Sequence, residues 1–313
     1  MLSIAICTHN RSADVRTCLD HLYPQIDFRV AQLLLVDSAS SPQEAEILDA
    51  CVAEYPNIQF VRLHEPGISR ARNAALAAAR GDWLAFLDDD AIPQHDWFEH
   101  VLRLMAAAPD TCAILGGNIT PVFPPMMDPR LGRRWRQLLS LIDQPDESFT
   151  ASNISVCGVN SLYRRSFLLE CGGFPEALGR VGTKLLSGEE KLVQEIALLR
   201  GWTVARSNVL RVGHRISAER LERRWVTNRA YWDGLSDERI RGILGQPTGF
   251  LGACELGGRL LLLGALYPAS PERQEFFLRF WYTLGRLREC FERARSNSKP
   301  EFPSGSLALH TDG

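Results

Sequence analysis

Short apolar runs alternate with segments of helical periodicity through the first 115 residues of the 313-residue chain. A short apolar run between turn signals is typical of a buried strand, whereas apolar residues spaced three and four apart indicate a helix. Alternation of this kind is typical of an α/β fold in which helices flank a mostly parallel sheet. Strands are predicted at Ser3–Cys7, Gln32–Val36, Ile58–Leu63, Trp83–Leu87 and Ala113–Leu115.

Helices are predicted between these strands and through much of the second half of the chain. Ser41, followed by Pro42 and Glu44, has the pattern of a helix start. Pro93 is expected to begin the helix that follows the fourth strand, and residues 121–150, rich in Pro, Arg and Asp, are expected to be irregular. The remaining predicted elements are helices at Ser69–Arg80, Ser166–Cys171, Ser187–Arg200 and beyond Ser217, and a strand at Cys157–Tyr163.

The composition argues against several classes of protein. A formal net charge of −2 provides no basic field for nucleic acid, and no nucleic-acid partner is expected. The eight cysteines include no C-x-x-C pair, so a zinc site is not expected. No signal-peptide pattern precedes the first predicted strand, and a cytoplasmic location follows as the default.

Three consecutive carboxylates, Asp88, Asp89 and Asp90, follow directly on the fourth predicted strand. Thr8 and Asp37 stand at the ends of the first two strands, and the carboxyl ends of parallel strands form a common ligand-binding edge. The acidic run is either a solvated turn or a cation site, because a bound divalent ion offsets the cost of burying unpaired carboxylates. Hard oxygen ligands favour Mg²⁺ or Mn²⁺, which substrate phosphates help to hold.

Six short segments occur in order along the first two thirds of the chain: CTHNR, VDSAS, EPGISRARNAAL, GDWLAFLDDD, ECGGFPEALG and SGEE. Together they resemble the motifs of the family 2 glycosyltransferases. The resemblance implies a GT-A fold and an inverting enzyme that depends on a nucleotide sugar. We expect a nucleotide-sugar-binding and catalytic domain over residues 1–215, a helical C-terminal extension over 216–295 and, from its polar composition, a disordered tail over 296–313.

By this resemblance, residues near the strand ends are expected to bind the nucleotide sugar and the metal. The family often has a second acidic residue after Asp37, whereas this chain has Ser38, which leaves the nucleotide base open. From the residues alone, Arg72 could equally form a surface salt bridge, and His214 could be structural. The expected nucleotide-sugar ligands are Thr8, Asn10, Asp37, Arg72, Asp88, Asp89 and Asn160, and the expected ligands of Mg²⁺ or Mn²⁺ are Asp90 and His214.

The segment SGEE is expected, by the same resemblance, to carry the catalytic base. Glu190 occupies the position where the family usually has aspartate, and Glu189 is the alternative base. Ser187 and Glu190 also have the spacing of a helix capping box, which needs no catalysis. The residues alone favour the cap, and the upstream motifs reverse that preference.

The second half of the chain has further basic and apolar segments with more than one interpretation. Arg164 or Arg165 is expected, by the resemblance, on the sugar and acceptor side. The Leu-rich helix at Arg259–Leu266 either packs on the main domain, contacts a partner or rests on a membrane, and core packing is favoured. Two interpretations exist for Arg220, Trp225 and Arg229. Their side chains either fold over the diphosphate or belong to the solvated face of a basic amphipathic helix, and the helix is favoured.

These features predict a metal-dependent inverting glycosyltransferase that moves a sugar from a nucleotide diphosphate sugar to an acceptor hydroxyl. The acceptor is expected to be a glycan, a polysaccharide or a lipid-linked sugar, with peripheral contact at the inner face of the cell membrane as an option. One rival is a catalytically silent sugar-nucleotide-binding subunit, which the Asp run and the Glu pair disfavour. The other is a nucleotidyltransferase that makes sugar nucleotides, although such enzymes usually have a Gly-rich loop where this chain has CTHNRSAD.

Overall fold

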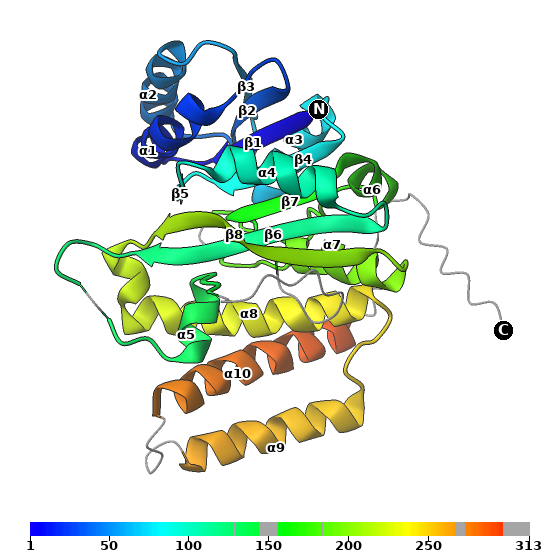
Figure 1. The fold of residues 1–313 in the computed structure, drawn as a ribbon. Helices are drawn as coiled ribbons and strands as arrows, with labels where there is room; N and C mark the ends of the chain where they lie inside the picture. Colours follow the sequence, from blue (N-terminus) through cyan, green and yellow to red (C-terminus); the bar gives the residue numbers. More distant parts are fainter. Residues whose placement is uncertain (128, 144–155, 183, 267–272, 297–313) are drawn as a thin grey trace.

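The computed structural model describes residues 1–127, 129–143, 156–182, 184–266 and 273–296. Within these ranges, eight strands form a single sheet in the order β3-β2-β1-β4-β7-β6-β8-β5, and helices lie on both of its faces (Figure 1). The strands are β1 (Leu2–Thr8), β2 (Ala31–Asp37), β3 (Ile58–Arg62), β4 (Trp83–Asp88), β5 (Ala91–Pro93), β6 (Cys112–Val122), β7 (Asn160–Arg164) and β8 (Thr203–Arg215).

The sheet is mixed but mostly parallel, as the sequence predicts. Strands β1 to β4 are parallel to their neighbours among themselves, and β6 is parallel to β8. Strand β7 runs antiparallel between β4 and β6, and β5 runs antiparallel to β8. In this register Thr8 pairs with Asp37, and Cys7 pairs with Asp88. The polar residues that end β1, β2 and β4 therefore stand side by side at one edge.

Helices α1 to α4, α6 and α7 cover the faces of the sheet. Helix α5 lies against α8 and α10, which with α9 extend below the sheet. Figure 1 shows α8, α10 and α9 stacked in turn on the side away from β1. The helices are α1 (Ser12–Leu22), α2 (Pro42–Ala53), α3 (Ile68–Ala78), α4 (Trp97–Ala107), α5 (Arg133–Leu138), α6 (Arg165–Glu170), α7 (Glu189–Leu199), α8 (Arg223–Ile243), α9 (Phe250–Leu266) and α10 (Arg273–Ser296).

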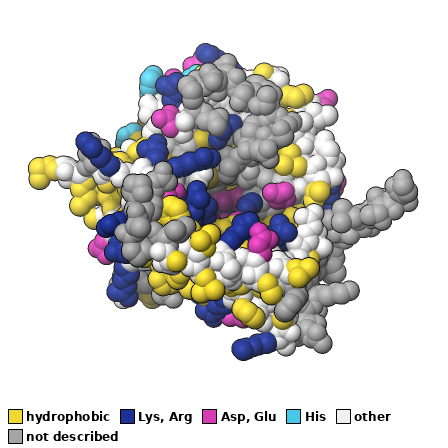
Figure 2. Space-filling model, turned by 90° about the horizontal axis from the view of Figure 1, so that it is seen from below, with side chains coloured by type: hydrophobic (Ala, Val, Ile, Leu, Met, Phe, Trp, Pro, Cys, Tyr) yellow, Lys and Arg dark blue, Asp and Glu magenta, His cyan; other side chains and the backbone are white. Residues whose placement is uncertain are grey.

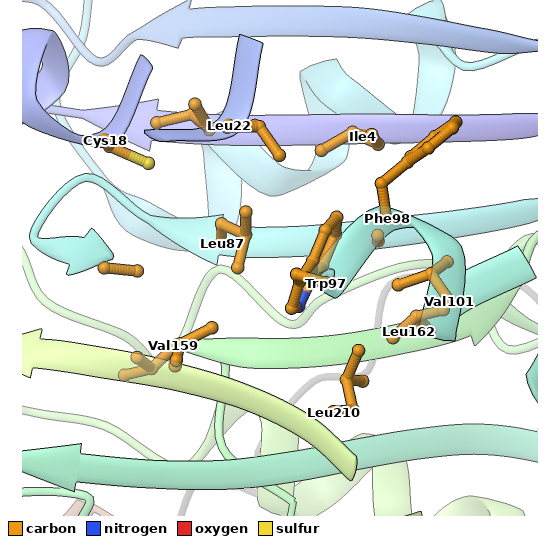
Figure 3. Packing of buried hydrophobic residues seen from close by; sticks show 14 of the residues in the cluster. Ile4, Cys18, Leu22, Leu87, Trp97, Phe98, Val101, Val159, Leu162 and Leu210 are labelled. Atoms are coloured by element: carbon orange, nitrogen blue, oxygen red, sulfur yellow. The ribbon is translucent and has the colours of Figure 1, made fainter. Parts of the chain in front are cut away.

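Alternate residues of the central strands fill two separate cores, because successive side chains of a strand point to opposite faces of the sheet. In β1, Ile4 and Ile6 pack with residues of α1, α2 and α4, whereas Ala5 and Cys7 pack with residues of α3, α6 and α7. Figure 3 shows the first core, into which Trp97 of α4 points. Burial on both faces explains why these strands are continuous apolar runs in the sequence.

Three predictions about single elements are wrong in part. Pro93 does not begin a helix but ends β5, and its helix starts at Trp97, because Ala91–Pro93 pair with β8. The strand predicted at Ala113–Leu115 continues to Val122, since β6 pairs with β8 along most of its length. Helix α5 lies within the stretch expected to be irregular.

The Leu-rich helix α9 is mostly exposed, so the preference for core packing is wrong for most of its surface. Leu256 is buried, but Leu251, Leu261 and Leu262 are 82%, 78% and 58% exposed. On the face drawn in Figure 2, seen from the side on which α9 lies, apolar side chains stand among those of Lys and Arg. None of the described helices has the length and hydropathy that a membrane span requires.

The sheet ends at Arg215, where the chain turns to the C-terminal helices. This change coincides with the predicted boundary at residue 215, although the division into domains itself stays a prediction. Residues 297–313 of the predicted tail lie outside the described residues.

Candidate active site

A cavity of about 370 Å³ opens at the carboxyl ends of the parallel strands. Thr8 ends β1, Ser38 follows β2, and the three aspartates follow β4, so the strand ends form one wall. The start of α7 and residues of β8 and α8 form the other walls. Eight of the residues expected to bind the substrate or the metal, or to remove the acceptor proton, line this cavity. They are Thr8, Arg72, Asp88, Asp89, Asp90, Glu189, Glu190 and His214.

Two of the three aspartates, Asp89 and Asp90, are buried and paired, which contradicts the alternative of a solvated turn. Asp89 and Asp90 are 6% and 3% exposed. The Thr8 hydroxyl donates a hydrogen bond to Asp89 Oδ2 at 2.8 Å, and Arg11 Nη1 donates to Asp89 Oδ1 at 3.0 Å and to Asp90 Oδ2 at 2.7 Å. Burial raises the pKa of Asp89 to about 7, although Arg11 opposes the rise.

Asp90 stands at the centre of a group of positive side chains. Its Oδ1 lies 3.3 Å from His214 Nε2, and its Oδ2 lies 3.3 Å from Arg220 Nη2 and 2.7 Å from Arg11 Nη1. Burial by itself raises the pKa of Asp90, but His214, Arg220 and Arg11 together hold it below its ordinary value. Asp90 is therefore ionised at neutral pH.

The chemistry of these donors fits a divalent ion that takes part of its shell from a substrate. Asp90 Oδ1 is buried, has no hydrogen-bond partner among the described residues and lies 3.3 Å from His214 Nε2. No group of three or more His, Cys, Asp and Glu side chains in the described ranges is placed to hold a metal by itself. An ion bound by one carboxylate and one imidazole would have most of its coordination positions left for phosphate oxygens and water, as is common for Mg²⁺ in nucleotide sites.

Glu190 has one oxygen held in place and the other free at the cavity. Its Oε1 accepts a hydrogen bond from the Gly158 backbone N–H at 3.0 Å and lies 2.7 Å from Arg72 Nη2. Its Oε2 has no partner among the described residues. Burial raises the pKa of Glu190 above its ordinary value, and Arg72 partly opposes this shift. A fixed, partly desolvated carboxylate with a free oxygen has the properties of a general base.

The capping-box interpretation of Glu190 is wrong. Helix α7 begins at Glu189, and its N-cap is Gly188, with a φ of 101° and no side-chain hydrogen bond. The hydroxyl of Ser187 instead accepts a hydrogen bond from Arg229 Nη1 at 3.0 Å. Neither Ser187 nor Glu190 makes the side-chain hydrogen bond that a capping box requires, because Gly188, in the left-handed conformation, turns the chain before the helix starts.

Arg72 is buried among carboxylates rather than exposed in a surface salt bridge. Its side chain is 4% exposed, with Nη1 2.7 Å from Glu189 and Nη2 2.7 Å from Glu190 and 3.5 Å from Asp88. Its guanidinium also lies over the rings of Phe86 and Phe174, at 5.8 and 5.6 Å. Arg72 lines the cavity, and its contacts connect Glu189 and Glu190 with Asp88 of the acidic run.

Three predicted ligands lie outside the cavity lining. The Asn10 side chain accepts a hydrogen bond from the Ser41 N–H at 2.7 Å, and Asp37 is fully buried in an ion pair with Arg62 at 2.8 Å. Asn160 is also fully buried, where it accepts from Trp97 Nε1 and donates to backbone carbonyls. In this structure these side chains connect elements around the site, and their ligand roles stay predictions.

Several basic residues complete the site. Arg220 and Arg229 are each 8% exposed and line the cavity with Trp225, so the preference for a solvated basic helix surface is wrong. Arg11 and Arg180 also line it, and the sequence analysis did not select either. Arg11 lies within CTHNR and could have been found there, whereas nothing local marks Arg180. Arg164 donates to carbonyls of Cys112 and Pro109 and does not line the cavity.

The sheet order and the position of the cavity define a GT-A-like α/β fold. The mannosyltransferase PcManGT from Pyrobaculum calidifontis, in complex with GDP-Man and Mn²⁺, matches with a TM-score of 0.60 at 16% identity, over 93% of this chain and 87% of that one. S. aureus TarS 1-349 in complex with UDP-GlcNAc matches with a TM-score of 0.53 at 15% identity, over 96% and 93%. At these identities the likeness shows the fold alone.

Residues 3–172 match the family model described as Glycosyl transferase family 2, and the chain belongs to this family. It is therefore a glycosyltransferase that uses a nucleotide sugar, as the six motifs predict. The glucosyl-dolichyl phosphate glucuronosyltransferase of Haloferax volcanii is 25% identical over 254 residues, which are 78% of this chain and 78% of that one. Glycosyltransferase AglE of the same organism is 26% identical over 182 residues, 56% of this chain and 57% of its own.

Proposed function

We propose that the protein is a metal-dependent, inverting glycosyltransferase that moves a sugar from a nucleotide diphosphate sugar to a hydroxyl of a glycan or lipid-linked acceptor. One observation carries the proposal. A single cavity holds the Asp90–His214 pair at one side and the free oxygen of Glu190 at another. Leaving-group stabilisation and proton removal are the two tasks of such a transfer, and the cavity has a candidate for each.

At the donor side, Asp90 and His214 would hold the divalent ion, whose positive charge would stabilise the leaving diphosphate. The Mn²⁺ in the PcManGT complex supports the use of a divalent ion, although it does not identify the residues that bind it. Arg220 and Arg229 line the same cavity and bind the diphosphate oxygens directly. Thr8, Asp88 and Asp89 border the space beside them and contact the nucleoside.

At the acceptor side, Glu190 removes the proton of the attacking hydroxyl through Oε2. Gly158 and Arg72 fix the orientation of its carboxylate. The hydroxyl attacks the anomeric carbon opposite the departing diphosphate, so the anomeric configuration inverts. Glu189 stays the alternative base, because its Oε1 also lies 2.7 Å from Arg72 and its Oε2 has no hydrogen-bond partner among the described residues. It is less accessible to an acceptor, since its side chain is 6% exposed and that of Glu190 is 22% exposed.

A second cavity, of about 980 Å³, supplies the space for the acceptor. Ser140 lines both cavities, and α7 runs from Glu190 at the first to Lys191 and Gln194 at the second. Asp233 of α8 also lines it and pairs with Arg134 at 3.0 Å. Acidic, basic and amide groups together suit the hydroxyls of a glycan. The Haloferax volcanii relative is named for a glucosyl-dolichyl phosphate, which is a lipid-linked sugar, and this name supports a lipid-linked acceptor.

Contact with a membrane surface would bring the protein close to such a lipid-linked acceptor. The exposed leucines of α9 provide an apolar surface, and Arg259 lies among them on the same helix. Location in the cytoplasm, at the inner face of the cell membrane, remains part of the proposal.

Incubation of the protein with Mn²⁺ or Mg²⁺ and a panel of UDP- and GDP-sugars tests the proposal. Release of nucleoside diphosphate and the mass of the product are measured. Glu190→Gln should bind the donor normally but transfer about 10²–10⁴-fold more slowly, whereas Asp90→Asn should lose donor binding and transfer together. Glu46→Gln, on the exposed side of α2, is the control.

The rival functions predict different results in the same experiment. A silent subunit would bind a sugar nucleotide without releasing nucleotide from it. A nucleotidyltransferase would form sugar nucleotides from a sugar phosphate and a nucleoside triphosphate. Transfer by Glu190→Gln at the native rate would show that this residue is not the base.

A further inference from the structure

Arg11 occupies the place on Asp90 that a cation needs. A single nitrogen, Nη1, lies 2.7 Å from Asp90 Oδ2 and 3.0 Å from Asp89 Oδ1, so it bridges two carboxylates as a metal ion does. Arg11 comes from the loop after β1, and the aspartates come from the loop after the neighbouring strand β4. The contact is therefore built by the parallel register of the sheet rather than by neighbours in sequence.

A guanidinium and a divalent ion cannot both use this carboxylate pair fully. Each stabilises the ionised form of Asp90, and two positive charges within a few ångströms repel each other in a partly desolvated cavity. Arg220 also contacts Asp90, but its side chain is 10% exposed and it lies 3.1 Å from His214. The Arg11 side chain is 34% exposed and lines the cavity, so it has space to turn away.

We propose that Arg11 is a resident counter-ion of Asp90 that gives way to the divalent ion and then binds the donor diphosphate. The inference rests on the proposed metal site. Without a nucleotide, the metal has to displace Arg11 from Asp90. The guanidinium of Arg11 is then left without an anionic partner, so metal binding is weak. With a diphosphate present, the guanidinium gains a new anionic partner. Arg11 thus makes the binding of metal and nucleotide diphosphate mutually dependent.

Titration of the full chain with Mn²⁺, followed by calorimetry and by the electron paramagnetic resonance of free Mn²⁺, tests this role without an activity assay. Wild type, Arg11→Gln and Arg11→Lys are titrated with Mn²⁺ alone, and again in the presence of UDP or GDP. Arg16→Gln is the matched control, because Arg16 of α1 pairs with Glu54 at the surface. Circular dichroism checks that each variant is folded.

Arg11→Gln should bind Mn²⁺ alone about ten-fold more tightly than wild type, which corresponds to about 1.4 kcal/mol. It should also gain less Mn²⁺ affinity from the nucleotide than wild type does. Arg11→Lys retains the charge and should resemble wild type, as should Arg16→Gln. Equal Mn²⁺ affinities of wild type and Arg11→Gln, with the same gain from nucleotide, would overturn the role of Arg11.

A failure of the proposed function has a different signature. If neither wild type nor Arg11→Gln binds Mn²⁺ with UDP or GDP present, the metal site at Asp90 is absent and the role of Arg11 falls with it. If both bind Mn²⁺ with nucleotide but do not differ, the metal site stands and only the role of Arg11 is wrong. Asp90→Asn, which should bind Mn²⁺ weakly in every condition, separates specific binding from background.

Discussion

Replacing Arg72 with methionine should destabilise the protein far more than replacing Arg70, two residues away on the same helix. Arg72 is 4% exposed and contacts Glu189, Glu190 and Asp88. Methionine fills similar space but leaves these carboxylates without their shared cation. Removing one partner of a buried ion pair costs about 3–5 kcal/mol, and this is the expected loss in the free energy of unfolding.

Arg70→Met provides the matched control. The Arg70 side chain is 41% exposed, and it pairs with Glu65 and Glu176, which are 71% and 50% exposed. Surface ion pairs of this kind contribute roughly 0–1 kcal/mol, so the unfolding midpoint should barely change. The two substitutions are chemically identical and differ only in the burial and number of the carboxylates that each arginine contacts.

Urea denaturation at pH 7.5 and at pH 5, followed by circular dichroism, measures both losses. The loss in Arg72→Met should shrink at pH 5. The reason is that the remaining carboxylates, whose pKa values rise without the guanidinium, take up protons. Equal midpoints for Arg72→Met and Arg70→Met, or a loss in Arg72→Met that is the same at both pH values, would refute this account of the buried cluster.

Three further measurements follow from the site and the C-terminal helices. Because burial raises the pKa of Glu190 above the ordinary 4.5 and a base acts only when ionised, transfer should increase with pH through a midpoint above 4.5; a lower midpoint would contradict this. The folded-state pKa of Asp89 is about 7 against an ordinary 3.8, so its protonation stabilises the fold below about pH 4, and this stabilisation is lost as pH rises to 7. Relative to Asp89→Asn, wild type should lose roughly 4 kcal/mol over that range, and a constant difference in unfolding free energy would be the opposite result. Leu261→Glu should reduce co-sedimentation with anionic lipid vesicles several-fold while Glu46→Gln leaves it unchanged; equal binding by both variants would exclude α9 as the contact surface.

Much of the fold could be predicted because the N-terminal half is locally consistent. Strands β1, β2 and β4 are buried on both faces, so each is a continuous apolar run that ends in a polar residue. The edge formed by Thr8 and Asp88 follows from that order alone, since parallel strands end at the same side. The pattern is weakest where pairing is distant, as for Pro93, whose strand exists only because β8 lies beside it.

The site was less predictable because its contacts join distant segments. The motif around Glu190 was compatible with a helix cap, and only the left-handed Gly188 and the bond from Gly158 exclude that interpretation. Asn160 is an expected nucleotide-sugar ligand, yet its side chain bonds inside the core. The positive charges around Asp90, such as Arg220, come from elements far along the chain, and no local pattern shows that they converge.

The positions of Asp90, His214 and Glu190 around one cavity are the centre of the account. A crystal structure of the protein with Mn²⁺ and a nucleotide diphosphate, recorded near the manganese absorption edge, tests it most directly. The account predicts one anomalous peak that contacts both Asp90 and the diphosphate, with Glu190 on the side left open for an acceptor. A bound nucleotide with no peak at Asp90, or a peak elsewhere in the molecule, would contradict it.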